Sequence, residues 1–160
     1  AVARAAAAGI VIVVAAGNGG DGSEPGIDPN QPDPFATSLL QAGGANVIIV
    51  GSNDSSGQFS SFSNRAGAAQ GSFLTALGED VCCLYQNGQL FVETISGQQF
   101  VTVFSGTSFS APQVTGAVAL LAQAFPNLTG RQIVEILLNS ARDAGAVGAE
   151  GVVLLADEGT

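Results

Sequence analysis

The sequence of 160 residues contains no histidine, no lysine, no methionine and no tryptophan. Its four basic side chains are arginines, against thirteen acidic ones, and the formal net charge is −9. A chain this acidic offers neither a basic stripe nor the side chains that neutralise phosphates, so we exclude nucleic acid as a partner. The absence of histidine also removes the side chain that most often acts as a general base.

Long hydrophobic runs are absent as well. The longest apolar stretch, residues 9–17, falls far short of the roughly 20 residues of a membrane span. We therefore expect no membrane insertion by this segment. Residues 1–8 lack the basic, apolar and small-residue regions of a leader peptide and form an alanine-rich helical pattern without a start signal. This predicts that residue 1 lies inside a longer protein.

Cysteine is scarce, with two residues, Cys82 and Cys83, adjacent in the sequence. Successive side chains of a strand point to opposite faces. We therefore expect one cysteine to point inward and the other outward, without a disulfide between them. Two cysteines make no disulfide framework and do not fix the redox compartment.

Hydrophobic residues make up 46% of the chain and glycine accounts for 22 residues, which is typical of an α/β domain with many tight turns. The length suits one domain with a single core over residues 1–160. Two apolar, β-branched runs at residues 10–16 and 45–51 predict parallel strands buried on both faces, and residues 73–77 predict a third strand. The predicted fold is α/β, with a mostly parallel sheet flanked by helices.

Helical and turn patterns complete the predicted organisation. Thr129 and Gln132 have the spacing of a capping box. The pair Asn87-Gly88 predicts a hairpin between residues 81–85 and 90–95. Residues 17–34, rich in glycine and proline, predict a long irregular loop of the kind that is usually functional or mobile. The predicted helices cover residues 1–8, 36–43, 107–124 and 130–141.

Ser108 is the first candidate functional residue. It stands at a glycine-marked turn between an apolar segment, residues 100–104, and the predicted helix 107–124. The N-terminus of a helix has unpaired N–H groups and a positive dipole end, which favour developing negative charge and suit a nucleophilic serine. The alternative is a structural one, in which Thr107 or Ser108 caps the helix.

Asn18 is the second candidate. It follows the predicted strand 10–16 at its carboxyl end, where α/β folds place the loops that contact ligands. Its amide could donate to an oxyanion, and glycines at 17, 19 and 20 would allow a substrate to approach closely. The alternative is an asparagine that merely adopts a left-handed turn.

These two segments resemble known sequence motifs. Ser105 to Val114 (Ser-Gly-Thr-Ser-Phe-Ser-Ala-Pro-Gln-Val) resembles the serine motif of the subtilisin-like serine peptidases, or subtilases. Val13-Val14-Ala15-Ala16-Gly17-Asn18 resembles the segment with the oxyanion-hole asparagine of that family. The resemblance covers nearly the whole chain and is greatest to bacterial subtilases, including autotransporter-type ones. Two departures are Leu77, where proline is usual, and Gln113, where histidine commonly follows Ala-Pro.

The resemblance implies a fold, an activity and site residues. It implies the subtilisin-like three-layer architecture and a serine endopeptidase that acts on peptide or protein substrates. Ser108 would be the nucleophile and Asn18 an oxyanion donor, while Ala15, Ala16 and Gly17 would line the substrate-side pocket. In the family the catalytic aspartate and histidine lie upstream of the asparagine. Residues 1–160 would therefore be the C-terminal part of the peptidase domain, inactive alone, and its partner the missing N-terminal part of the same domain.

Cofactors and localisation also rest on the resemblance. The sequence shows no metal site and no cofactor, whereas the family resemblance admits calcium. Most bacterial relatives are exported, which implies a secreted or cell-surface protein. The acidic residues of the loop predict surface charge or a weak cation site; they are Asp21, Glu24, Asp28 and Asp33.

Two alternative functions stay open. One is a degenerate subtilase module that binds peptides or a partner chain without catalysis. The other is a sedolisin-like peptidase, which has a similar serine motif but uses a glutamate as base and an aspartate as oxyanion group. Asn18 argues against the sedolisin alternative.

Overall fold

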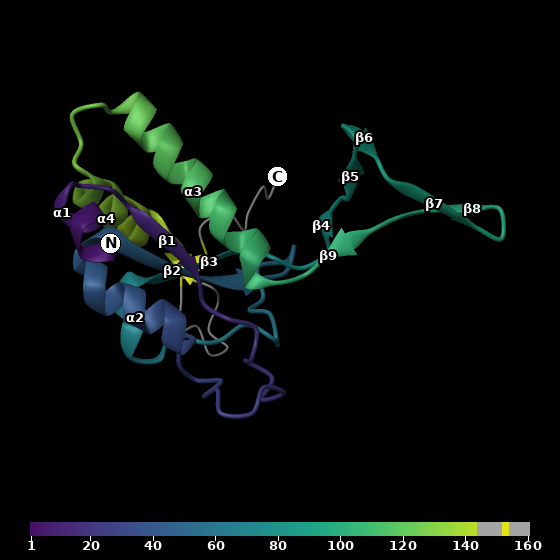
Figure 1. Cartoon of the computed structure of the whole chain (residues 1–160), viewed down its shortest axis with the longest axis horizontal. Helices are drawn as coiled ribbons and strands as arrows, with labels where there is room; N and C mark the ends of the chain where they lie inside the picture. Colours follow the sequence, from purple (N-terminus) through teal and green to yellow (C-terminus); the bar gives the residue numbers. More distant parts are fainter. Residues whose placement is uncertain (144–151, 154–160) are drawn as a thin grey trace.

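A computed structural model describes residues 1–143 and 152–153, and the rest of the predicted domain lies outside the described residues. A five-stranded sheet with the order β1-β2-β3-β11-β10 forms the centre (Figure 1). β10 is antiparallel to β11, and the other neighbours are parallel. The strands are β1 (Ile12–Ala15), β2 (Val47–Asn53), β3 (Phe73–Leu77), β10 (Arg142–Asp143) and β11 (Val152–Val153). The prediction of a mostly parallel sheet is confirmed.

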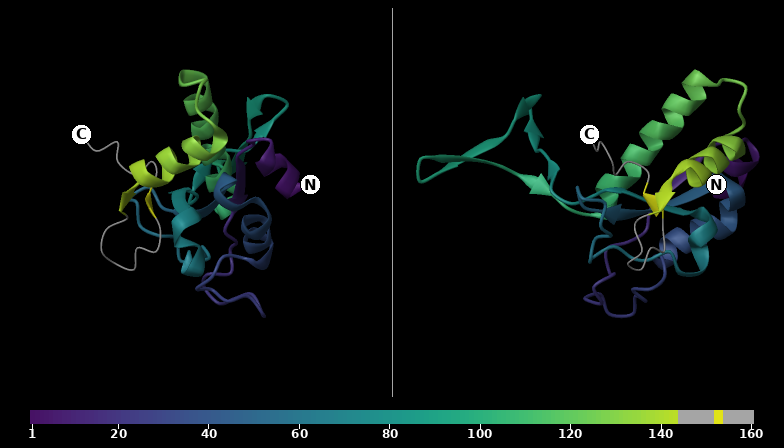
Figure 2. Two further views of the ribbon diagram at one scale, coloured as in Figure 1. Left: turned by 90° about the vertical axis from the view of Figure 1, so that its left-hand side faces the viewer. Right: turned by 180° about the vertical axis from the view of Figure 1, so that it is seen from behind.

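Helices cover both faces of this sheet (Figures 1 and 2), which confirms a three-layer α/β architecture. α2 lies on one face, and α3 and α4 lie on the other. None of the helices in the described part of the chain is long and apolar enough to cross a membrane. The α-helices are α1 (Val2–Ala7), α2 (Pro34–Gly43), α3 (Thr107–Ala124) and α4 (Gly130–Ser140), with short 3₁₀ turns η1 (Gly44–Asn46) and η2 (Gly67–Ser72).

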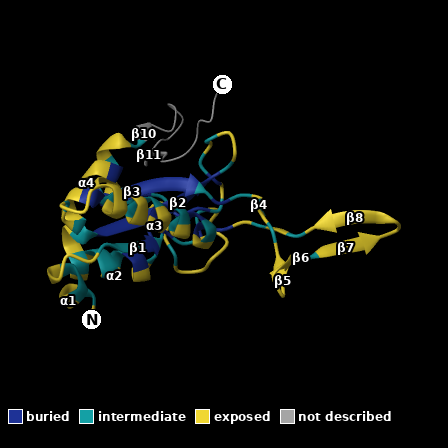
Figure 3. Ribbon diagram, turned by 90° about the horizontal axis from the view of Figure 1, so that it is seen from above, coloured by how far each residue is buried: buried dark blue, intermediate teal, exposed yellow. Residues whose placement is uncertain are grey.

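The alternation of side chains along β2 builds the two halves of the core. Val47 and Ile49 pack with Ala36 of α2 on one face. Ile48 and Val50 point to the opposite face and pack with residues of α3 and α4. Because successive strand residues point to opposite faces, a continuous apolar run is what a strand between two helix layers requires. Figure 3 shows β2 as buried along its length.

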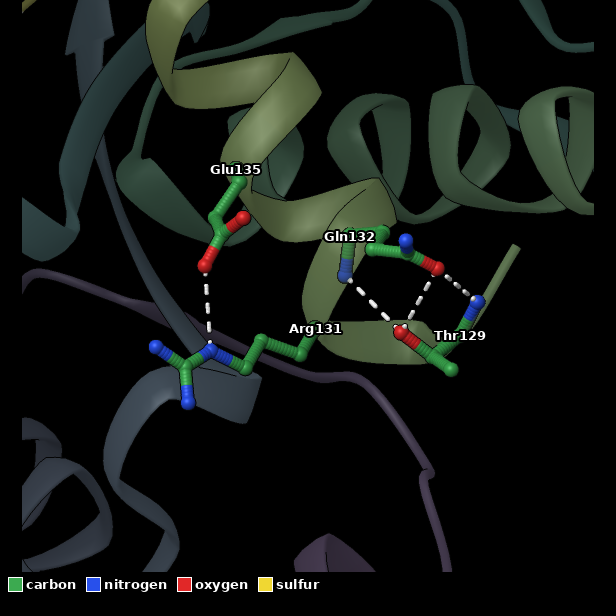
Figure 4. A network of polar contacts seen from close by, with 4 residues as sticks. All are labelled: Thr129, Arg131, Gln132 and Glu135. Atoms are coloured by element: carbon green, nitrogen blue, oxygen red, sulfur yellow. Dashed lines mark hydrogen bonds and ion pairs between the residues drawn. The ribbon is translucent and has the colours of Figure 1, made fainter.

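Local signals fix the helix ends. α3 has the bounds that its apolar periodicity predicts, and the predicted capping box at the start of α4 is confirmed (Figure 4). The Thr129 hydroxyl accepts from the Gln132 N–H at 3.3 Å, and the Gln132 side-chain oxygen accepts from the Thr129 N–H at 2.9 Å. The exposed Arg131–Glu135 pair at 3.0 Å adds little, since solvent screens such pairs.

Residues 81–104 form an extension, here called the arm, that projects from the body of the molecule (Figure 1). The Asn87-Gly88 hairpin is confirmed next to the turn, where Tyr85 pairs with Leu90, but the predicted pairing does not continue to residues 81–82 and 92–95. A second turn at Ser96-Gly97 reverses the chain again, so residues 92–95 pair with later residues. The three antiparallel pairs are β4 (Val81–Cys82) with β9 (Val103–Phe104), β5 (Tyr85–Gln86) with β6 (Gln89–Leu90), and β7 (Val92–Ile95) with β8 (Gln98–Val101).

The arm exposes much of its apolar surface and contains both cysteines. Exposed large side chains include Tyr85, Ile95 and Phe100. The prediction that Cys82 and Cys83 point to opposite faces is wrong, because their sulfur atoms lie against one another. The absence of a disulfide between them stays a prediction. The structure joins them by a cis peptide bond and pairs their two sulfur atoms.

Candidate active site

Ser108 lies in the first turn of α3, and its side chain is exposed. Gly106, two residues before Ser108, has a φ of 153°, which residues with a side chain rarely adopt. Within the described residues, the Ser108 hydroxyl accepts from no helix N–H, and the Thr107 hydroxyl bonds to Gly17 and Asn18 instead. The alternative in which Thr107 or Ser108 caps the helix is therefore wrong. Ser108 presents a free hydroxyl and a first-turn N–H that has no intrahelical acceptor.

Asn18 lies beside this turn, just beyond the carboxyl end of β1. Its Oδ1 atom accepts from the Thr107 backbone N–H and from the Thr107 hydroxyl, each at 2.9 Å. A backbone N–H only donates, so the amide oxygen must face Thr107 and the NH₂ group must point elsewhere. That NH₂ group lies 3.5 Å from the position that a Cβ on Gly106 would take. Asn18 does not have a positive φ, so the left-handed-turn alternative is wrong as well.

Thr107 joins two parts of the chain that are 89 residues apart in sequence. Besides its contacts with Asn18, its hydroxyl accepts from the Gly17 N–H at 3.3 Å, and the residue is buried. These bonds hold the end of β1 against the start of α3. Sequence reasoning considered Thr107 only as a helix cap, because a hydrogen bond across such a separation leaves no local signal.

Asn64 fixes the loop that carries Asn18, and sequence reasoning gave it no role. Its side chain is fully buried, and its Oδ1 atom accepts from the Gly19 N–H at 2.7 Å. Its amide group donates to the Gln31 carbonyl at 2.8 Å, and its backbone N–H donates to the Gly17 carbonyl at 3.1 Å. No local pattern pointed to it, because its partners Gly19 and Gln31 are 45 and 33 residues away in sequence. The loop around Asn18 is therefore held on both sides.

The turn that carries Ser108 is also tied to the end of β3. The Gln113 amide donates to the carbonyls of Leu77 and Phe109 at 2.6 and 2.9 Å. The Gly106 N–H donates to the Gly78 carbonyl at 2.7 Å. Gln113 and Leu77, the two departures from the family pattern, thus contact one another and fix the start of α3. A site held by such contacts is positioned before any substrate arrives.

The three residues expected to line the substrate-side pocket lie at and just after the end of β1. Ala15 and Gly17 are half-buried, whereas Ala16 is fully buried. The Ala16 N–H donates to the Val50 carbonyl at 2.8 Å, and its carbonyl accepts from the Asp33 N–H at 2.7 Å. The Ala16 N–H is therefore occupied, whereas its carbonyl oxygen keeps one lone pair that could accept a second hydrogen bond. The assignment of these three residues stays a prediction.

The described residues hold no base for Ser108. The chain has no histidine, and no side chain of residues 1–141 forms a hydrogen bond with the Ser108 hydroxyl. The loop carboxylates accept from nearby backbone N–H groups: Asp21 from Ser23, Asp28 from Asn30, and Asp33 from Phe35. Hydrogen bonds from Ser23 hold the pKa of Asp21 below its ordinary value, which makes it a poor base. No group of three or more potential metal ligands gathers within the described ranges.

Comparisons with known proteins bear on the family and the fold of the chain. The sequence matches the Subtilase family over residues 1–153. Mycosin-1 of Mycolicibacterium smegmatis is 39% identical over 150 residues, which cover 86% of this chain and 32% of that protein. An extracellular serine protease of Serratia marcescens is 28% identical over 165 residues, with 93% of this chain and 15% of that protein covered.

The fold is also similar to that of a solved structure. The crystal structure of MycP1 with the N-terminal propeptide removed matches with a TM-score of 0.64 at 32% identity, covering 91% of this chain and 49% of that chain. The chain therefore spans about half of that structure and a third or less of the two curated relatives.

Proposed function

Because the chain belongs to the subtilase family of serine peptidases, we propose that it carries the nucleophile and the oxyanion donors of a serine endopeptidase that hydrolyses peptide or protein substrates. The observation that supports this most is the pair of hydrogen bonds from Thr107 to Asn18 Oδ1. They turn the Asn18 NH₂ group away from Thr107 and hold the residue beside the helix turn of Ser108. Acyl transfer requires a serine hydroxyl next to N–H donors for the oxyanion, and here the donors would be the Asn18 NH₂ group and the Ser108 backbone N–H.

The proposed chemistry follows from these positions. Ser108 Oγ attacks the scissile carbonyl carbon, and the carbonyl oxygen becomes an oxyanion that accepts from the Ser108 N–H and the Asn18 NH₂ group. Collapse of this intermediate releases the amine and leaves an acyl group on Ser108, which water then removes. A base must take the Ser108 proton in the first step and return it to the leaving amine. None of these steps uses a metal or a cofactor.

We propose that the base and its orienting carboxylate come from a segment N-terminal to Ala1, as the family resemblance implies. Two facts support this: the 160 residues contain no histidine, and the chain spans about half of the matched MycP1 structure. The chain together with this segment makes up the complete protein. The name of the Serratia relative supports a secreted or cell-surface location.

A degenerate, non-catalytic module is the second candidate function. The absence of a base among the described residues and the exposed apolar arm favour it. A module of this kind would keep the fold and bind a peptide without cleaving it. The sedolisin-like alternative is not favoured, because residue 18 is a neutral amide held by two donors from Thr107.

The 160-residue chain alone is expected to hydrolyse peptides no faster than its Ser108→Ala variant. A neutral serine hydroxyl is a weak nucleophile without a positioned base. The measurement is release of a fluorophore from a peptide library at neutral pH, with both proteins prepared in parallel. Turnover that disappears in the Ser108→Ala variant would show that a group within the 160 residues acts as the base. It would overturn the proposal that the base comes from a segment N-terminal to Ala1.

A further inference from the structure

The chain contains two asparagine–glycine pairs, Asn18-Gly19 and Asn87-Gly88. In such a pair the glycine nitrogen can attack the side-chain carbonyl carbon of asparagine, because glycine has no side chain to hinder the approach. A new C–N bond forms, the side-chain amide leaves as ammonia, and a succinimide ring results. Water then opens the ring and yields aspartate or isoaspartate. The structure places the two pairs in very different surroundings.

At the first pair, the attacking nitrogen is held by another residue. The Gly19 N–H donates to Asn64 Oδ1 at 2.7 Å in a buried hydrogen bond. The acceptor cannot swing away, since the Asn64 amide group and backbone N–H are themselves bonded to the Gln31 and Gly17 carbonyls. On the other side, the Gly20 N–H donates to the Phe62 carbonyl at 2.8 Å. The Gly19 nitrogen therefore cannot lose its proton or turn toward Asn18 without breaking this network.

The side chain of Asn18 is not what prevents the reaction. Its Oδ1 atom accepts two hydrogen bonds from Thr107, and donors on a carbonyl oxygen stabilise the negative charge that develops during attack. Taken alone, the Thr107 contacts would favour ring closure. Asn18 is also exposed, so water can reach it. Protection must therefore act on the nitrogen of Gly19.

The second pair has no such restraint. Asn87-Gly88 forms the two-residue turn between β5 and β6, and both residues are exposed. No acceptor within the described part of the chain bonds the Gly88 N–H. Asn87-Gly88 therefore serves as an internal control for deamidation of an Asn-Gly pair whose glycine N–H is not held.

We infer that Asn64 protects Asn18 from deamidation by holding the Gly19 N–H. The consequence for catalysis rests on the proposed function: a carboxylate at position 18 has no donor and would repel an oxyanion, so deamidation would inactivate the enzyme. The chemistry itself does not depend on that function, because it is measured by mass and not by activity.

The test is peptide mapping by mass spectrometry during incubation of the 160-residue chain in mildly alkaline buffer. Asn87 is expected to convert first, while Asn18 stays an amide. In Asn64→Ala the conversion of Asn18 is expected to rise about tenfold, which corresponds to about 1.4 kcal/mol in the barrier, with Asn87 unchanged. Thr107→Val is the matched control, since it removes the hydroxyl that donates to Asn18 Oδ1 and leaves both the backbone N–H bond of residue 107 to Asn18 and the Gly19 bond. It should not accelerate the reaction.

Three results would overturn the inference: equal rates at Asn18 and Asn87 in the parent chain, no change of their ratio in Asn64→Ala, or equal acceleration by Thr107→Val. Amide hydrogen exchange of the parent chain tests the inference without any variant, so the test does not depend on whether a variant folds. The Gly19 amide is expected to exchange far more slowly than the Gly88 amide, and equal exchange would also overturn the inference.

Discussion

Peptide hydrolysis by the complete protein is expected to fall by about 10⁶-fold in kcat when Ser108 is replaced with alanine, the size known for loss of the nucleophile in subtilisin, itself a member of this family. The reason is that no other hydroxyl of the described residues shares the position of Ser108. Its side chain is exposed and unbonded at the start of α3, whereas the Thr107 hydroxyl is already occupied by Gly17 and Asn18.

Steady-state hydrolysis of a peptide substrate measures this effect. Ser55→Ala is a suitable control, because Ser55 is exposed in the turn after β2 and forms no hydrogen bond among the described residues. The control should retain full activity. Activity that survives in Ser108→Ala at more than a few per cent would mean that another residue is the nucleophile.

Asn18→Ala in the complete protein is expected to lower kcat by about 10²–10³, the size known for loss of the equivalent donor in subtilisin, with little change in KM. The direction follows from the geometry of this chain. The Asn18 NH₂ group has no acceptor among the described residues, so its hydrogen bond forms only as the oxyanion develops. An interaction made only in the transition state changes kcat and leaves ground-state binding nearly unchanged.

The matched control is Asn87→Ala, which removes an asparagine from the same Asn-Gly context in the arm. Its kinetic constants should equal those of the parent protein. A rise in KM with unchanged kcat in Asn18→Ala would assign Asn18 to substrate binding and would remove it from the oxyanion hole.

Local sequence patterns predicted the elements that carry the site. β3 and α3 have the predicted bounds, because an apolar run between turns and an apolar stripe at helical spacing are both local properties. Ser108 and Asn18 were found through their resemblance to family motifs, each at the end of a predictable element. The hydrogen bonds of Thr107 supplied what the sequence could not: they show which residues hold the two segments side by side.

The errors concern contacts between residues that no local pattern links. The arm has two turns, and residues 92–95 could pair across either of them. They pair with residues 98–101 across the Ser96-Gly97 turn, which the Asn87-Gly88 signal alone did not indicate. Asn64 is a polar residue in a polar stretch, and its role depends on Gly19, 45 residues away in sequence. Buried polar groups must find partners, but one sequence does not say which partner.

Labelling of the complete protein with a fluorophosphonate, followed by peptide mass spectrometry, shows whether Ser108 is an activated nucleophile. The reagent reacts with a serine whose proton is withdrawn by a base and whose oxyanion is stabilised. One label is expected, on Ser108, and no label on the 160-residue chain alone. A label on another residue would contradict the assignment of Ser108 as the nucleophile, and a folded complete protein that stays unlabelled would favour the non-catalytic binding module.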